Sequence, residues 1–184
     1  MVFIPTGKEL IDPYKLLEDA GLTKGMVTAD FGCGTLGHYV FPAAKMVGGE
    51  GKVYAIDILK SVLSGITSRI KLESATNVET LWGDLERVNG IKLADGVLDI
   101  GMLINNLFLS NQQEVMMKEC VRMVRSGGLF ILVDWKPGGV SFGSGTENRV
   151  SPSDAKLLAE GAGLEYVKDL HPGEQHYGFL YKKP

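Results

Sequence analysis

The sequence predicts an α/β fold: a doubly wound, mostly parallel sheet of seven strands with helices on both faces. Three observations support this prediction. Short apolar runs, typical of buried strands, alternate with amphipathic segments along all 184 residues. A glycine-rich turn follows the first apolar run. The last two strand-like runs are joined by His171–Glu174, a link short enough to make them an antiparallel hairpin.

Helices and strands are expected to alternate until that hairpin. Apolar side chains at helical spacing predict helices over Lys8–Ala20 (with Pro13 inside it), about Gly37–Val47, Ser61–Glu73 and Glu114–Val124, and Ser151-Pro152-Ser153-Asp154 opens a further helix. Apolar runs predict strands over Met26–Phe31, Val53–Ile58, Val78–Trp82, Gly96–Ile104, Leu129–Val133, Leu164–Leu170 and His176–Lys182. Gly127-Gly128 predicts a turn before the fifth strand, and Pro137–Thr146 a loop.

The composition is that of an ordinary globular protein. Hydrophobic residues make up 45% of the chain and charged residues 22%, and the length fits one domain, residues 1–184. The net charge of -3 disfavours a nucleic-acid partner, because such proteins need a basic face. Two cysteines without a CxxC spacing favour free thiols and a reducing, cytoplasmic location. Neither a signal peptide nor an integral membrane segment is expected.

A nucleoside-binding site is predicted at the turn after the first strand. Gly32, Gly34 and Gly37 have the spacing G-x-G-x-x-G, in which the first glycine permits a tight turn and the second lets the backbone approach a ligand. Asp57 ends the second strand about 20 residues after the last glycine, the distance expected for a carboxylate that binds ribose hydroxyls. Capping of the next helix is the alternative role for Asp57.

Asp30, two residues before the first glycine, indicates which nucleoside binds. In a dinucleotide site the pyrophosphate lies over this turn, at the N-terminus of the helix, where a neighbouring carboxylate would repel it. An ammonium or sulfonium ion would be attracted by the same carboxylate. S-adenosylmethionine carries both cations, so Asp30 favours it over a nicotinamide dinucleotide. A solvated turn aspartate is the alternative interpretation.

The segment Asp30-Phe31-Gly32-Cys33-Gly34 resembles motif I of the class I S-adenosylmethionine-dependent methyltransferases. The similarity continues with Asp57 at the position of the ribose-binding acid, through Trp82-Gly83-Asp84, Arg125-Ser126-Gly127-Gly128 and the terminal hairpin, and so covers nearly the whole chain. Leu36 departs from the pattern, since motif I often has a glycine there. The pattern is similar to the compact small-molecule or ubiquinone-menaquinone-type branch of the family.

This resemblance implies a Rossmann-like sheet with the strand order 3-2-1-4-5-7-6 and S-adenosylmethionine as cofactor. It also implies an acid near the adenine amino group at Asp84, for which a helix N-cap is the alternative role. The candidate cofactor-binding residues are Asp30, Gly32, Cys33, Gly34, Gly37, Asp57, Ile58, Gly83, Asp84, Leu85 and Asn105. Cys33 is expected to be a small residue that fits the turn rather than a reactive thiol.

The reacting groups are expected beyond the carboxyl ends of the parallel strands, where open α/β sheets bind their ligands. His176, at the start of the last strand, is the candidate general base, because an imidazole accepts a proton near neutral pH. Asp134, at the end of the fifth strand, is a second candidate, either as the base or as the partner that orients His176. Purely structural roles are the alternative for both. The three histidines lack the spacing of metal ligands, so no metal site is predicted.

A small-molecule or lipid-like methyl acceptor is favoured, because no sizeable domain is inserted between the strands. Two regions are expected to build its pocket. The N-terminal residues 1–22 form a helix or lid, with Phe3–Tyr14 folding over the cofactor, and the loop Pro137–Arg149 lies after the fifth strand. Arg149 or Lys136 is a candidate partner for an anionic group of the acceptor.

Two other functions remain open from the sequence. An NAD(P)-dependent reductase fits the glycine pattern, but Asp30, the length of the chain and the absence of a Y-x-x-x-K pair disfavour it. A non-catalytic cofactor-binding protein with the same fold is the other. Asn105-Asn106-Leu107-Phe108 has the outline of N-P-P-Y, a motif of methyltransferases that act on bases or glutamine, but both prolines are missing. Nothing in the sequence predicts the oligomeric state.

Overall fold

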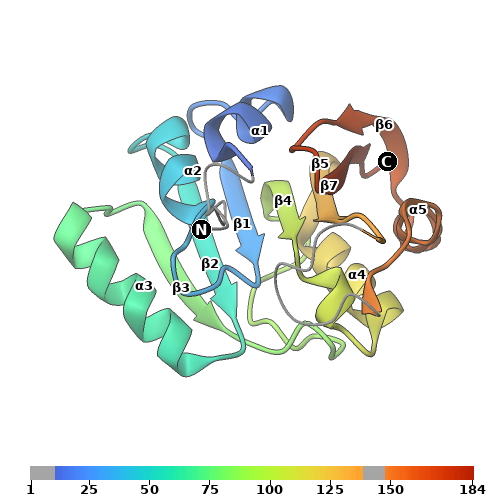
Figure 1. Ribbon diagram of the computed structural model, residues 1–184. Helices are drawn as coiled ribbons and strands as arrows, with labels where there is room; N and C mark the ends of the chain where they lie inside the picture. Colours follow the sequence, from blue (N-terminus) through green and yellow to red (C-terminus); the bar gives the residue numbers. More distant parts are fainter. Residues whose placement is uncertain (1–10, 139–147) are drawn as a thin grey trace, which may run out of the picture.

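The computed structural model describes residues 11–138 and 148–184. It contains one sheet of seven strands in the order β3-β2-β1-β4-β5-β7-β6, with helices on both faces (Figure 1). The predicted fold class and strand order are therefore confirmed. The arrowheads of β1 and β2 point to the same edge of the sheet in Figure 1, and this carboxyl edge is where the functional residues gather.

Five parallel strands and an antiparallel hairpin make up the sheet. The strands are β1 (Val27–Phe31), β2 (Lys52–Asp57), β3 (Val78–Trp82), β4 (Leu98–Ile104), β5 (Val124–Trp135), β6 (Glu165–Leu170) and β7 (His176–Lys182). Neighbouring strands from β3 to β5 are parallel. β7 lies antiparallel to both β5 and β6, so the start of β7 reaches the carboxyl edge of β5.

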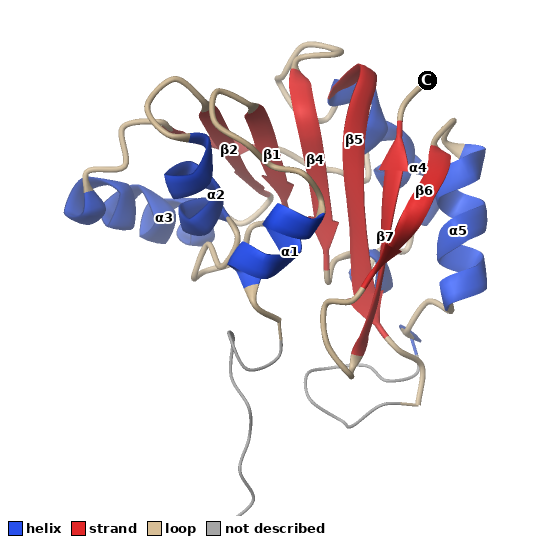
Figure 2. Ribbon diagram, turned by 90° about the horizontal axis from the view of Figure 1, so that it is seen from above, coloured by secondary structure: helices blue, strands red, loops and turns tan. Residues whose placement is uncertain are grey.

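The helices cover the two faces of the sheet in two groups. They are α1 (Pro13–Asp19), α2 (Val40–Val47), α3 (Lys60–Glu73), α4 (Gln113–Met123) and α5 (Pro152–Gly161), with the short 3-10 helix η2 (Leu107–Leu109) after β4. In Figure 2, α1 and α2 lie in front of the strands and α4 lies behind β5 and β7. One apolar core lies under α1, α2 and α3 and includes Leu17, Val40 and Ile66. The other lies under α4 and α5 and includes Met117 and Ala155.

Two helices begin later than the sequence predicted. α1 begins at Pro13, because the side chain of Asp12 accepts hydrogen bonds from the amides of Tyr14 and Lys15 and so caps the helix. The predicted start at Lys8 lies outside the described residues. α2 begins at Val40 rather than at Gly37, because Gly37 has a φ of 52° and belongs to the turn.

The predicted turn at Gly127-Gly128 lies inside β5 instead. Leu98 of β4 pairs with Val124, and the next pair is Ile100 with Leu129, so the residues between Val124 and Leu129 form a bulge. The strand continues through the bulge because Lys183, just beyond β7, bonds to it. Its amide donates to the carbonyl of Gly128 at 2.9 Å, and its carbonyl accepts from the amide of Gly127 at 2.7 Å.

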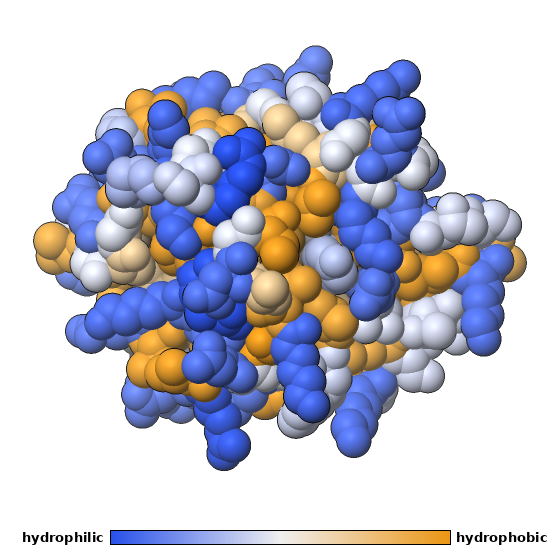
Figure 3. Space-filling view, turned by 180° about the vertical axis from the view of Figure 1, so that it is seen from behind, coloured by the Kyte–Doolittle hydropathy of each residue, from blue (hydrophilic) through white to orange (hydrophobic). Residues whose placement is uncertain are grey.

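The surface mixes charged and apolar side chains. Seen from behind, it carries hydrophobic patches between hydrophilic side chains (Figure 3). Within residues 11–138 and 148–184, none of the helices has the length and apolar character needed to cross a membrane. Both cysteines, Cys33 and Cys120, are buried free thiols.

Candidate functional site

The glycine turn after β1 has left-handed backbone conformations, which residues other than glycine rarely adopt. Gly32, Gly34 and Gly37 have φ values of 75°, 63° and 52°, in the left-handed region that favours glycine. The amides of Gly32 and Cys33 both donate to the carbonyl of Ile56 in β2, at 2.9 and 3.0 Å. The turn is therefore fixed to the sheet by its own backbone.

A cavity of about 370 Å³, which we call the glycine-loop cavity, opens at this turn. It unites residues from the ends of β1 and β4 and from the start of β7. It is lined by Ile11, Asp30, Gly32, Cys33, Gly34, Leu36, His38, Tyr39, Ile104, Asn105, Asn106, Leu109 and His176. The volume lies in the range of about 300–1,000 Å³ that is usual for small-molecule sites.

Asp30 is the buried acid of this cavity. Its exposed fraction is 1%, and its Oδ2 atom has no hydrogen-bond partner among the described residues. Burial, together with the nearby charge of Asp57, raises its pKa to about 7. A buried carboxylate oxygen without a partner costs free energy unless a ligand supplies one. A cation in the cavity would be that partner.

Asp57, in contrast, is already bonded within the protein. Its Oδ2 accepts from the amide of Gly34 at 3.2 Å and its Oδ1 from the amide of Leu59 at 2.9 Å. It thus holds the glycine turn and the entry to α3, which agrees in part with the alternative capping role. β2 ends at Asp57, so Ile58 lies beyond the strand, 52% exposed, and its carbonyl accepts from the indole N–H of Trp82 at 2.8 Å. Binding of ribose by Asp57 stays a prediction.

The segment Gly83, Asp84 and Leu85 has clear structural partners. Gly83 forms an antiparallel bridge with Ile91. Asp84 accepts from the amide of Glu86 at 3.0 Å and pairs with Arg87 at 3.3 Å, and Leu85 is a buried core residue. No α-helix begins directly after Asp84, so Asp84 does not cap a helix; its carboxylate stabilises a turn instead. Contact of these residues with a cofactor remains a prediction.

Asn105 and Asn106 follow β4 and have different tasks. Asn105 has a φ of 56°, and its buried Oδ1 has no partner among the described residues. The Nδ2 of Asn106 donates to the carbonyls of Phe31, Gly32 and Ile104, at 3.0, 3.1 and 2.8 Å. A Cβ at Gly32 would overlap this amide group, so glycine is required there for close packing as well as for the turn.

Asn106 is a site residue that the sequence reasoning did not identify. The signal was present, because a polar residue directly after a buried strand lies at the carboxyl edge. Tyr39 was also missed. It lines the cavity, and the charge of Asp30 contributes to raising its pKa. His38 lies in the turn before α2 and its ring contacts the carbonyl of Ile11 at 3.1 Å, which holds Ile11 at the cavity.

The structure does not bring the two catalytic candidates together. Asp134 pairs with Tyr177 and Trp135 with His176 in the register of β5 and β7. Since successive side chains point to opposite faces, Asp134 and His176 lie on different sides of the sheet. Asp134 accepts instead from the amides of Phe108, at 3.1 Å, and Trp135, at 2.7 Å. The expectation that Asp134 orients His176 therefore has no contact to support it.

Burial raises the pKa of Asp134 to about 6, although its amide partners act in the opposite direction. Asp134 does not belong to the residues that line the glycine-loop cavity. Its two carboxylate oxygens fix the 3-10 helix η2 and the end of β5. These contacts give Asp134 a structural role.

His176 lines the cavity and is 2% exposed. Its ring stacks on Trp135 with a centroid distance of 4.0 Å, and neither ring nitrogen has a partner among the described residues. Burial, with the charges of Arg149 and Lys136, lowers its pKa to about 4. The imidazole is therefore neutral at physiological pH, with a free lone pair. The described residues include no group of three or more His, Cys, Asp or Glu side chains placed to hold a metal ion.

The sheet order, the left-handed glycine turn and the buried acid before it define a Rossmann-like methyltransferase fold, as the resemblance in motif I implied. The chain belongs to the methyltransferase domain family, whose sequence profile matches residues 22–160. A SAM-dependent methyltransferase from Aquifex aeolicus, known from a crystal structure, superposes with a TM-score of 0.89 at 26% identity. That match covers 98% of this chain and 94% of the other.

Two curated relatives match a shorter region. Demethylmenaquinone methyltransferases from Lactococcus lactis and Staphylococcus aureus are 27% and 28% identical over 120 residues, 65% of this chain. The chain spans about half the length of these relatives, 46% and 47% respectively.

Proposed function

We propose that this protein is an enzyme that transfers a methyl group from S-adenosylmethionine to a small aromatic or lipid-like acceptor of the quinol type. The observation that carries this proposal is the buried Oδ2 atom of Asp30 beside the glycine turn, which has no hydrogen-bond partner among the described residues. The family membership and the names of the two curated relatives support the reaction and the acceptor class. A cytoplasmic location stays part of the proposal.

Residues of the glycine-loop cavity and residues at the ends of β2 and β3 fit this cofactor. Asp30 would bind the ammonium group, and the Oδ1 of Asn105, which has no partner among the described residues, would accept a second polar hydrogen. Asp57, at the end of β2, would hold the ribose hydroxyls through lone pairs that its two amide contacts leave free. The exposed side chains of Ile58 and Trp82 offer an apolar surface for the adenine, and the indole N–H of Trp82 donates to the backbone carbonyl of Ile58.

When bound, S-adenosylmethionine supplies a methyl carbon that bonds to the acceptor while the carbon–sulfur bond breaks, its electron pair stays on sulfur and the acceptor loses a proton. The protein's task is to align the acceptor and to manage that proton. Alignment alone supplies roughly 7–11 kcal/mol in well-oriented reactions. His176 is placed to take the acceptor proton. Lys136 and Arg149, which lower the pKa of His176, would also favour an ionised acceptor oxygen beside it.

Calorimetric titration separates this function from a reductase. We expect S-adenosylhomocysteine, the demethylated product, to bind the full chain and NADH not to bind. Binding of NADH without S-adenosylhomocysteine would overturn the proposal. A transfer assay with methyl-labelled cofactor, run over quinols, phenols, amines and phospholipid head groups, then separates an enzyme from a non-catalytic binding protein.

The variant His176→Asn tests the proton acceptor, because asparagine keeps a similar size but cannot take the proton. We expect kcat to fall by about 100-fold or more, with the affinity for S-adenosylhomocysteine unchanged. A variant that keeps the wild-type kcat across the pH range would show that His176 is not the base.

A further inference from the structure

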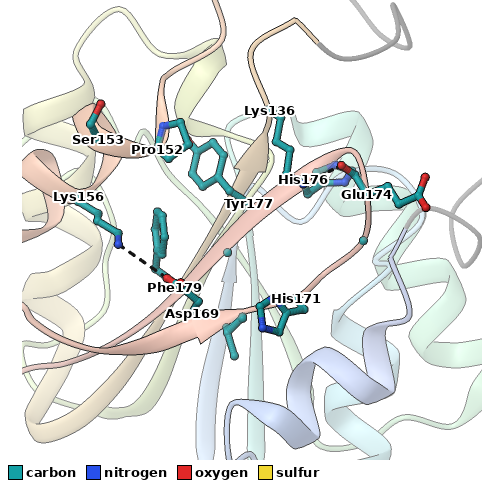
Figure 4. Close-up of a pocket in the computed structure, with 13 residues that line it drawn as sticks. Lys136, Pro152, Ser153, Lys156, Asp169, His171, Glu174, His176, Tyr177 and Phe179 are labelled. Atoms are coloured by element: carbon teal, nitrogen blue, oxygen red, sulfur yellow. Dashed lines mark hydrogen bonds and ion pairs between the residues drawn. The ribbon is translucent and has the colours of Figure 1, made fainter.

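A second and larger cavity, which we call the hairpin cavity, lies around the start of β7 (Figure 4). Its volume is about 760 Å³. It is lined by the β6–β7 hairpin, the end of β5 and the start of α5, through Lys136, Pro152, Ser153, Lys156, Asp169, Leu170, His171, Gly173, Glu174, His176, Tyr177, Gly178 and Phe179. One residue of this lining also lines the glycine-loop cavity.

That residue is His176. Among the described residues, it is the single member common to the linings of the hairpin cavity and the glycine-loop cavity. The start of β7 thus forms the boundary between the two cavities. The exposed fraction of His176 is 2% and neither ring nitrogen has a partner among the described residues, so a polar ligand group would satisfy the imidazole.

Tyr177 is a second buried polar group of the hairpin cavity. It is 6% exposed, and its hydroxyl has no hydrogen-bond partner among the described residues. In Figure 4 its ring points toward Pro152, at the start of α5. Burial raises the pKa of this hydroxyl, so it stays protonated and offers a donor as well as an acceptor. Tyr177 follows His176 in β7, so the two side chains point to opposite faces of the sheet. A buried hydroxyl without a partner among the described residues indicates that the ligand on this face carries a hydroxyl group.

The rest of the lining is suited to an aromatic body. Phe179 and Tyr177 lie with ring centroids 5.4 Å apart, and Pro152 and Leu170 add apolar surface. The ammonium group of Lys156 lies 4.5 Å above the Phe179 ring and 3.7 Å from Asp169, so its charge is balanced within the protein. Lys136 donates to the carbonyl of Glu174 at 2.8 Å. The cavity therefore favours a largely apolar, uncharged ligand.

We propose that the hairpin cavity binds the non-reacting body of the methyl acceptor, a hydroxylated aromatic compound whose hydroxyl bonds to Tyr177. This inference rests on the proposed function for the identity of the ligand as the methyl acceptor. It adds a location for the acceptor and a specificity-determining hydroxyl at Tyr177.

The first test uses Tyr177→Phe and two probes, naphthohydroquinone and naphthalene, titrated into the protein saturated with S-adenosylhomocysteine. We expect naphthohydroquinone to bind the variant about tenfold more weakly than the wild type, and naphthalene to bind both equally. A merely structural hydroxyl would leave the binding of both probes unchanged and overturn the assignment of Tyr177. Removing an unpartnered hydroxyl is expected to leave the thermal stability unchanged or raised, so a loss of binding cannot come from unfolding.

The second test fills the cavity. Ser153 lines it from the exposed first turn of α5, so Ser153→Trp should weaken naphthohydroquinone binding by more than tenfold. The matched control is Leu157→Trp on the same helix, because Leu157 is 66% exposed and lies outside this cavity. We expect the control to change binding by less than about twofold. Equal binding by both variants would overturn the location.

Failure of this proposal is distinguishable from failure of the proposed function. If wild-type protein does not bind S-adenosylhomocysteine, the proposed function is wrong. If it binds S-adenosylhomocysteine but neither Tyr177→Phe nor Ser153→Trp alters naphthohydroquinone binding, the hairpin proposal alone is wrong.

Discussion

Asp30 and Asp134 occupy matching places in the sheet and differ in what surrounds them. Both are buried acids near the carboxyl end of a parallel strand, and burial raises the pKa of both. The oxygens of Asp134 accept hydrogen bonds from two amides, whereas Oδ2 of Asp30 has no partner among the described residues. Residue type and topology are the same, so the contacts alone separate a structural acid from a candidate ligand-binding acid.

Asp30→Asn is the variant that should separate the two acids most clearly, because only Asp30 is expected to bind the cofactor. Removal of the charge is expected to weaken S-adenosylhomocysteine binding by about 100-fold or more, the cost of losing one partner of a buried ion pair. Calorimetric titration measures it.

The same variant should also change stability in the opposite direction. The pKa of Asp30 is about 7 in the folded protein and 3.8 in the unfolded reference, so folding favours the protonated acid and the wild type loses stability as pH rises between these values. Asp30→Asn is therefore expected to stabilise the cofactor-free protein at pH 8, by up to about 4 kcal/mol. If Asp30→Asn binds S-adenosylhomocysteine as tightly as the wild type, Asp30 does not contribute to cofactor binding.

The pH dependence of binding gives the next largest effect. An ammonium group requires the ionised form of Asp30, so affinity for S-adenosylhomocysteine should fall below pH 7, approaching about tenfold per pH unit. Titrations from pH 5 to pH 8 follow this change. The slope should vanish in Asp30→Asn, and a persistent slope in that variant would assign the proton to another group.

Asn106→Ala tests whether the glycine turn needs its amide support. The change removes the hydrogen bonds to three carbonyls, so we expect affinity for S-adenosylhomocysteine to fall about tenfold and stability by about 1–2 kcal/mol. Titration and chemical denaturation give the two quantities. Unchanged values for both would mean that the turn is fixed by its own backbone alone.

Asp134→Ala should have the smallest effect on the cofactor. The amides of Phe108 and Trp135 would lose their partner, so stability is expected to fall by about 2–4 kcal/mol. Affinity for S-adenosylhomocysteine, measured well below the unfolding temperature, should change by less than about threefold. A large loss of affinity would mean that Asp134, like Asp30, contributes to cofactor binding.

Periodicity predicted the sheet, the family resemblance implied its strand order, and topology placed the candidate site residues beyond the carboxyl ends of the strands. The glycine turn and Asp30 could be identified from the sequence, because a carboxylate just before the glycines would repel a pyrophosphate and attract a cationic ligand. The side of the sheet on which Asp134 and His176 lie depends on strand register, which the sequence does not display. Likewise, the bulge at Gly127-Gly128 depends on Lys183, which bonds to it from the far end of the chain. The roles of Gly83, Asp84 and Asp57 toward a cofactor stay predictions.

The position of β7 has a consequence for biosynthesis. β7 is inserted between β5 and β6, and it follows every other strand of the sheet in the sequence. A chain emerging from the ribosome can form the glycine turn early but can complete the sheet only after residue 182 is free. Until then the apolar edge of β5 is unpaired, so this edge is the point at which a nascent chain most needs protection from aggregation.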